Sequence, residues 1–183
     1  MDTKDIIKKI AKVHEATPDE ISAVIKNSEN DGFLFECADK VRREAYGTDV
    51  YIRGLIEFTN YCKNNCFYCG IRRDNRNIKR YRLSIDEIME CCEEGYKLGF
   101  RTFVLQGGED AGFTDDKLCN MISGIKKRYS DCAVTLSMGE RTEESYKRLY
   151  DSGADRYLLR HETASKEHYG MLHPPEMSFE RRI

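Results

Sequence analysis

The chain has 183 residues, of which 40% are hydrophobic and 34% are charged, an ordinary composition for a soluble globular domain with a buried core. The formal net charge of −2 provides no overall basic field, which argues against nucleic acid or an anionic membrane as a partner. The first residues lack the apolar core of a signal peptide, and no segment approaches the roughly 20 apolar residues of a membrane span, so we expect a cytoplasmic protein.

The first 48 residues predict a short helical region. Four apolar side chains share one face of a first helix, namely Ile6, Ile7, Ile10 and Val13. The segment 17–20, Thr-Pro-Asp-Glu, provides an N-cap, a first-turn proline and a capping-box acid for a second helix. A third helix is expected over 33–46, and Gly47 can end it in the left-handed conformation. We therefore expect a helical N-terminal region at 1–48 and a separate core at 49–183.

From Val50 the sequence becomes β-rich and leads into a loop that carries Cys62, Cys66 and Cys69 at the spacing C-x3-C-x2-C. Three thiolates at this spacing can hold three irons of a cubane cluster and leave the fourth iron open, which makes a catalytic site. Structural zinc sites use four ligands, whereas this loop offers three cysteines and no histidine. A zinc site, a disulfide and a loose cysteine cluster are therefore the weaker alternatives.

The loop that follows the cysteines is rich in basic residues, namely Arg72, Arg73, Arg76, Lys79, Arg80 and Arg82. Such a run is usually a solvated face, but its place beside the cysteines also permits local attraction of an anion. The remaining cysteines are scattered over predicted helices and a strand, where we interpret them as small buried hydrophobic residues: Cys37, Cys91, Cys92, Cys119 and Cys132.

Beyond this loop, helices and strands alternate. Helices are expected at 84–98, 114–129 and 142–150, and strands at 101–105, 133–137 and 155–160. This alternation predicts an α/β fold with a parallel sheet of right-handed β-α units, either a barrel or an open doubly wound sheet. Polar residues follow each strand: the cysteine loop, the Gln-Gly-Gly-Glu segment 106–109, Ser137, and the His-Glu pair 161–162. Active sites of both architectures gather at these strand ends.

Four segments carry a resemblance to a known family. They are IEFTNYCKNNCFYCGIRRDN at 56–75, VLQGGED at 104–110, TLSMGE at 135–140 and DRYLLRHETAS at 155–165. Together they resemble the radical S-adenosylmethionine (SAM) superfamily, and within it the HydE family of radical enzymes that help to assemble the FeFe-hydrogenase active site. The RRDN and LLRHET segments favour this family over methylornithine synthase-like and biotin synthase-like enzymes. A non-catalytic iron-sulfur or zinc-binding module is the alternative from another class.

The resemblance implies that Cys62, Cys66 and Cys69 ligate a 4Fe-4S cluster whose open iron binds S-adenosyl-L-methionine. The reduced cluster would then cleave this cofactor to methionine and a 5′-deoxyadenosyl radical. The implied substrate is a small molecule or an iron complex, and other hydrogenase maturation proteins are possible partners. No nucleic acid partner is expected.

Further site residues follow from the resemblance. Tyr68 takes the place of the family's aromatic residue before the third cysteine. Gly107 and Gly108 would let the backbone approach the methionine end of the cofactor, and Glu109 would order that turn or accept from the amino group. The other implied cofactor contacts are Ser137, Glu162 on the ribose hydroxyls and Arg182 on the methionyl carboxylate, with Arg181 as a neighbouring alternative. The implied substrate contacts are Gln106, Thr135 and Arg156.

The length of the chain bears on the predicted architecture. A complete β/α barrel takes about 250 residues, whereas about four β-α units are visible here. We therefore expect a partial, truncated (β/α) TIM-type barrel that follows a short helical N-terminal region. Such a fragment is expected to bind a cluster without turning over substrate, because the strands that complete the substrate cavity are not in this sequence.

Overall fold

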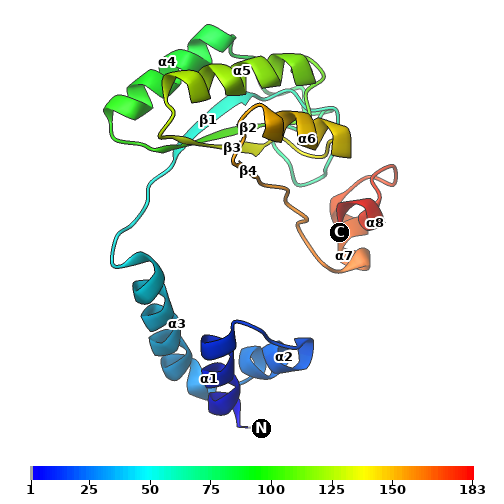
Figure 1. Ribbon diagram of the computed structural model, residues 1–183. Helices are drawn as coiled ribbons and strands as arrows, with labels where there is room; N and C mark the ends of the chain where they lie inside the picture. The colour runs from blue at the N-terminus through cyan, green and yellow to red at the C-terminus, as the bar shows by residue number, and fades with distance from the viewer. Residues whose placement is uncertain (1) are drawn as a thin grey trace. The chain divides into compact units, whose positions relative to one another are not determined.

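The computed structural model describes residues 2–183 and divides them into two compact units, residues 2–51 and residues 52–183. The first unit is helical and contains α1 (Thr3–Val13), α2 (Pro18–Lys26), a short 3-10 turn η1 (Ser28–Asn30) and α3 (Asp31–Tyr46). Helix α1 packs against both α2 and α3 (Figure 1). Among the described residues, no helix has the length and apolar character needed to cross a membrane.

The helix ends of the first unit are set by the residues that the sequence indicates. The Thr17 hydroxyl accepts from the Glu20 amide at 3.2 Å, and the Glu20 carboxylate accepts from the Thr17 amide at 2.9 Å. This capping box satisfies two donors that would otherwise lack partners. Gly47 ends α3 with a φ of +65°. Ile6 and Ile7 are buried as expected, whereas Val13, the last residue of α1, is 47% exposed.

The second unit is built on a parallel sheet with the strand order β1-β2-β3-β4. The strands are β1 (Gly54–Thr59), β2 (Thr102–Gly107), β3 (Ala133–Ser137) and β4 (Arg156–Tyr157), and the helices are α4 (Ile85–Lys97), α5 (Asp115–Arg128), α6 (Glu143–Asp151), α7 (Lys166–Leu172) and α8 (Phe179–Arg182). Consecutive strands are neighbours, as in a β/α barrel, whereas a doubly wound sheet reverses its strand order at a switch point. The sheet therefore forms part of a barrel.

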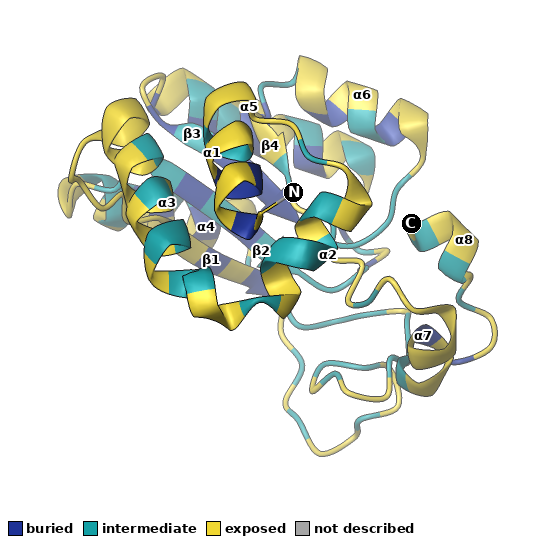
Figure 2. Ribbon diagram, turned by 90° about the horizontal axis from the view of Figure 1, so that it is seen from below, coloured by how far each residue is buried: buried dark blue, intermediate teal, exposed yellow. Residues whose placement is uncertain are grey.

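Buried residues alternate with more exposed ones along β2 and in most of β1, and β3 is buried over most of its length (Figure 2). Their side chains build the core between the sheet and its helices. Helix α4 packs on β1, α5 on β3, and α6 on α5. The largest fully buried side chains of this core are Phe58, Phe103, Leu105, Val134 and Leu136 from the strands, Met138 from the loop after β3, and Ile88, Leu118, Met121, Ile122, Ile125 and Leu149 from the helices. The other face of the sheet is more open, since Leu55 on β1 is 56% exposed.

Three strands differ from their predicted lengths. The strand expected at 101–105 is β2, which runs from Thr102 to Gly107 and so includes Gln106 and Gly107. The stretch 50–53 is not a strand, and β1 begins at Gly54. The last strand was expected over 155–160, but only Arg156 and Tyr157 pair with β3. Hydrogen bonds from the amides of Asp155 and Leu158 to β3 extend this contact by one residue at each end, and the chain then leaves the sheet.

Replacement of Leu136 by alanine should lower the free energy of unfolding of the second unit by about 2–5 kcal/mol, because this side chain is fully buried between β3 and the helices. Leu98 is 78% exposed and provides the matched control, for which we expect a change within about 0.5 kcal/mol. Urea denaturation followed by circular dichroism measures both. Equal effects of the two substitutions would contradict the assigned core.

Candidate functional site

A pocket of about 220 Å³ lies at the carboxyl ends of the strands. All of the residues predicted for the site line it, except Thr135 and Arg156: Cys62, Cys66, Tyr68, Cys69, Gln106, Gly107, Gly108, Glu109, Ser137, Glu162 and Arg182. These residues come from the cysteine loop, from the ends of β2 and β3, from the segment after β4 and from α8. The topology of the sheet thus brings together residues that are far apart in the sequence.

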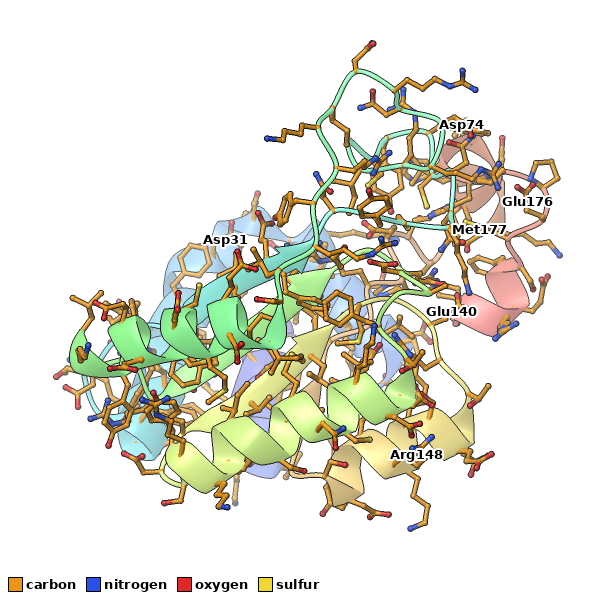
Figure 3. The ribbon with its side chains drawn as sticks, turned by 90° about the horizontal axis from the view of Figure 1, so that it is seen from above. Asp31, Asp74, Glu140, Arg148, Glu176 and Met177 are labelled. Atoms are coloured by element: carbon orange, nitrogen blue, oxygen red, sulfur yellow. The ribbon has the colours of Figure 1, made fainter. Side chains whose placement is uncertain are left out.

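The cysteine loop is fixed to the rest of the unit by its backbone. The amide of Lys63 donates to the Glu109 carbonyl at 3.0 Å, and the amide of Phe67 donates to the Leu172 carbonyl at 2.9 Å. The Cys66 thiol lies 3.7 Å from the thioether of Met177, on the segment before α8 (Figure 3). The loop is therefore held between the β2 end on one side and the C-terminal segment on the other.

The donor set of the loop fits an iron-sulfur cluster. Burial raises the pKa of the Cys62 thiol, and burial together with the neighbouring thiols of Cys62 and Cys69 raises the pKa of Cys66 to about 11. The three thiols are thus close enough to influence one another, and soft sulfur ligands suit iron-sulfur chemistry. Among residues 2–183, no three Cys, His, Asp or Glu side chains form a group that could hold a single metal ion. In a cubane cluster each thiolate ligates a different iron.

The two glycines after β2 allow the cysteine loop to pack closely on the end of this strand. A Cβ atom on Gly108 would lie 2.3 Å from the Tyr61 carbonyl oxygen and 2.6 Å from the Cβ of Cys62. A Cβ atom on Gly107 would lie 2.7 Å from the Thr59 methyl group. The structure therefore gives these glycines a packing role that the sequence analysis did not anticipate, in addition to any approach to a ligand.

Glu109 joins three parts of the site. Its side chain is 9% exposed, and its carboxylate accepts from the Glu140 amide at 2.9 Å and from the Lys63 ammonium at 3.1 Å. Gly139 adopts a φ of +79°, and a Cβ atom there would lie 2.2 Å from Cγ of Glu109. Of the two roles considered for Glu109, these contacts support the ordering of the turn.

The structure distinguishes Arg182 from Arg181. The Arg182 side chain is 10% exposed and lines the pocket, whereas Arg181 is 68% exposed and does not. Nε of Arg182 lies 2.7 Å from the Glu140 carboxylate, and Nη1 donates to the Arg160 carbonyl at 3.1 Å. Glu140 was not predicted as a site residue, and it lies near the C-terminal segment in Figure 3.

Tyr68 and Glu162 both line the pocket, and the Glu162 carboxylate is close enough to act on the Tyr68 phenol. Burial raises the pKa of the Tyr68 phenol, and the negative charges of Cys66 and Glu162 raise it further. The ring of Tyr68 packs edge-on against His173 with 5.5 Å between the ring centroids. Glu162 has a φ of +68°, which is uncommon for a residue other than glycine and is often associated with functional sites.

A polar row runs across the strand ends, and the sequence analysis missed its members Glu57 and Arg160. The Gln106 amide donates to the Glu57 carboxylate at 3.1 Å, and its carbonyl oxygen accepts from Arg160 at 3.2 Å. Gln106 is the register partner of both Glu57 and Ser137, so their side chains share one face of the sheet. The two-residue alternation of β1 could have indicated Glu57, since Ile56 and Phe58 are apolar.

Thr135 and Arg156 do not reach the pocket. Thr135 lies two residues before Ser137 on β3 and pairs in register with Arg156, so both belong to the next layer of the sheet. The Thr135 hydroxyl is buried and has no hydrogen-bond partner, whereas Arg156 is exposed. Their assignment as substrate contacts stays a prediction.

A buried carboxylate beneath the pocket connects the strand ends. Asp110 is 2% exposed, and its carboxylate accepts from Arg82 at 2.6 and 2.8 Å, from the Thr59 hydroxyl at 2.7 Å and from the Gly112 amide at 2.8 Å. The Arg82 guanidinium also stacks over the Tyr61 ring at 3.7 Å. Arg82 is thus bound to a buried carboxylate, although 43% of its side chain stays exposed.

Comparison with known proteins assigns the class. The family model described as the radical SAM superfamily matches residues 56–183, and the chain therefore belongs to this superfamily, whose members are enzymes that use an iron-sulfur cluster and SAM. The chain is 47% identical to the FeFe hydrogenase maturase subunit HydE of Thermotoga maritima over 150 aligned residues. This alignment covers 82% of this chain and 42% of the HydE protein.

Two solved structures share the fold. The crystal structure of methylornithine synthase matches with a TM-score of 0.81 and 26% identity, covering 97% of this chain and 53% of that chain. The crystal structure of HydG, a maturase of the FeFe-hydrogenase, matches with a TM-score of 0.81 and 30% identity, and this match covers 97% of this chain and 41% of the HydG chain. The prediction of a partial β/α barrel after N-terminal helices is confirmed, and the chain spans about half the length of these relatives.

The substitution Gly108→Ala should displace the cysteine loop, because the new methyl group would meet a backbone carbonyl. We expect a loss of about 1–3 kcal/mol in the free energy of unfolding, measured by chemical denaturation. Gly70 lies in the same loop, and a Cβ atom there would meet nothing within 4 Å, so Gly70→Ala is the control. A Gly108→Ala chain as stable as the control would refute the close packing.

The substitution Asp110→Asn should lower the free energy of unfolding by about 2 kcal/mol near neutral pH, less than for a fully buried pair because Arg82 is 43% exposed. Burial opposes ionisation of Asp110, but its hydrogen bonds, above all from Arg82, hold the pKa of the folded carboxyl below its ordinary value. The contribution of Asp110 to the free energy of unfolding is therefore complete above about pH 4. It is lost as the pH falls through the lower pKa of the folded chain.

The pH dependence of the two chains provides the check on Asp110. The difference in unfolding free energy between wild type and Asp110→Asn should be constant from about pH 5 to 7 and should shrink as the solution becomes more acidic. Denaturation titrations at several pH values measure this difference. A difference that grows on acidification would show that the sign of the assigned pKa shift is wrong.

Proposed function

We propose that the chain is part of a HydE-like radical SAM enzyme that helps to assemble the active-site cluster of FeFe-hydrogenase. The observation that carries this proposal is the pocket in which Cys62, Cys66 and Cys69 meet the glycine turn after β2 and the carboxylates of Glu109 and Glu162. The 47% identity to a HydE protein over 82% of the chain supports the choice within the superfamily. The division into an N-terminal region at 1–48 and a radical SAM core at 49–183 belongs to the same proposal.

In this proposal the three cysteines hold a 4Fe-4S cluster, and Arg182, Glu162 and Tyr68 bind S-adenosyl-L-methionine beside it. When bound, this pair of cofactors supplies a 5′-deoxyadenosyl radical. Gly107, Gly108 and Ser137 shape the wall of the pocket, and Gln106 offers hydrogen bonds at its floor. Thr135 and Arg156 are kept as substrate contacts in the layer below.

The RRDN segment, residues 72–75, makes contacts within the cysteine loop that support the resemblance to HydE. Asp74 accepts from the Asn65 side chain at 2.8 Å, Asn75 donates to the Gly70 carbonyl at 2.7 Å, and Arg72 donates to the Cys69 carbonyl at 3.1 Å. The segment therefore supports the shape of the cysteine loop. Its similarity to HydE supports a shared loop geometry, while the substrate, which we expect to be a small molecule or an iron complex, depends on residues elsewhere.

The cellular setting follows from the same proposal. A protein of this kind acts in the cytoplasm beside other hydrogenase maturation proteins. Because the chain covers 42% of the length of the HydE relative, we expect it to bind a cluster and the cofactor without coupled turnover of substrate.

Anaerobic reconstitution with iron and sulfide, followed by electron paramagnetic resonance of the reduced chain, tests the proposed function. We expect a 4Fe-4S signal that shifts on addition of SAM, because only an open iron can bind the cofactor. The substitution Cys66→Ser should lower cluster content at least about tenfold. Cys91 is exposed on α4, so Cys91→Ser should bind as wild type does. A wild-type chain without a cluster, or with a signal indifferent to SAM, would refute the proposal.

A further inference from the structure

Arg80 makes an unusual set of contacts in the cysteine loop. Its guanidinium is half-buried and donates to the backbone carbonyls of five residues, namely Asn60, Ile71 at 2.9 Å, Arg72 at 2.6 Å, Arg73 at 3.5 Å and Asn75 at 3.1 Å. Among the ion pairs of residues 2–183, none involves Arg80, whereas Arg82 pairs with Asp110 and Arg73 with Asp74. The contacts of Arg80 are therefore directed entirely to the backbone.

The acceptors of Arg80 lie on both sides of the cysteines. Asn60 precedes Cys62, and the other acceptors follow Cys69. One guanidinium therefore joins the segment where the chain enters the loop to the segment where it leaves. The Asn60 side chain closes the same junction, since it donates to the Lys79 carbonyl at 2.8 Å and accepts from the Tyr81 amide at 2.8 Å.

The chemistry of arginine suits this place in the loop. The segment 60–80 contains no helix or strand, so few of its carbonyls are paired within regular backbone ladders. A guanidinium carries five N–H donors in a rigid plane and can bond several carbonyls in different directions at once. A lysine offers three donors from one nitrogen, and a glutamine offers two, so neither can connect the same set of carbonyls.

We propose that Arg80 is the positioning residue that holds the loop 60–75 in the shape that presents Cys62, Cys66 and Cys69 to one cluster. This inference rests on the proposed function, because it assigns to the loop the binding of a cluster. Arg80 acts through the backbone carbonyls, and among the described residues it is not one of those that line the pocket. The sequence analysis offered two roles for the basic residues of this segment, a solvated face and the attraction of an anion. The backbone contacts of Arg80 give it a third role.

The substitutions Arg80→Gln and Arg80→Lys test this role in the reconstituted chain. We expect Arg80→Gln to lose its cluster to an iron chelator about 10–100-fold faster than wild type, as is usual when a residue supporting metal ligands is removed. Arg80→Lys should restore part of this stability. Arg76 is exposed in the same loop, so Arg76→Gln removes a basic side chain of the same segment from the surface and should behave as wild type.

Two further readouts separate positioning from a general loss of stability. The reduced signal of Arg80→Gln should broaden or change its response to SAM, whereas that of Arg76→Gln should not. In the metal-free chains, backbone amides of 60–75 should exchange hydrogen at least about tenfold faster in Arg80→Gln, while those of β2 and β3 keep their protection. This exchange measurement also works for a chain that binds no cluster, so the inference and the proposed function can fail separately.

The outcomes that would overturn the inference are specific. If the backbone amides of 60–75 exchange hydrogen as slowly in Arg80→Gln as in wild type, Arg80 does not hold the loop in place. If both Arg80 variants lose the cluster at the wild-type rate, the contacts of Arg80 with the loop do not stabilise cluster binding. If Arg80→Gln is unfolded by circular dichroism, Arg80→Lys decides the matter, since a folded Arg80→Lys chain with an unchanged loop and cluster refutes the role.

Discussion

The carboxylate of Asp110 is the constraint on which the rest of the site depends. Its two oxygens bind Thr59 at the end of β1, Arg82 at the exit of the cysteine loop and the Gly112 amide after β2. A buried anion is costly unless it is paired and hydrogen-bonded, and here all of the partners come from segments that must meet for the pocket to form. Folding of the strand ends and assembly of the site are thus one event.

The cysteine loop has no regular secondary structure, and its shape is imposed from outside by three kinds of contact. Glycine at 108 allows the backbone of β2 to approach the loop, the Arg80 guanidinium binds carbonyls at its two ends, and the Leu172 carbonyl holds the Phe67 amide. Each of these contacts involves a backbone group of the loop, so none of them occupies a cysteine sulfur.

Much of the fold could be predicted because its signals are local. Capping residues such as Thr17 and Ser84 specify helix starts, and the alternation of β-rich and helical segments specifies the β-α units. The short β4 could not be predicted, because its length depends on how much of β3 is available for pairing. The partners of Arg80 and Arg82 were also missed, since a run of basic residues does not show which side chains bind carbonyls or a carboxylate in the folded chain.

The contact between Arg182 and Glu140 has a consequence for ligand binding. In the free chain the guanidinium already has a carboxylate at 2.7 Å, so a carboxylate ligand that approaches Arg182 would replace one anion by another instead of meeting an unpaired cation. Such an exchange avoids leaving a nearly buried charge without a partner at any stage. The affinity for such a ligand then depends on a competition with Glu140. A weaker Arg182–Glu140 pair would favour the ligand, and a stronger one would favour the pair.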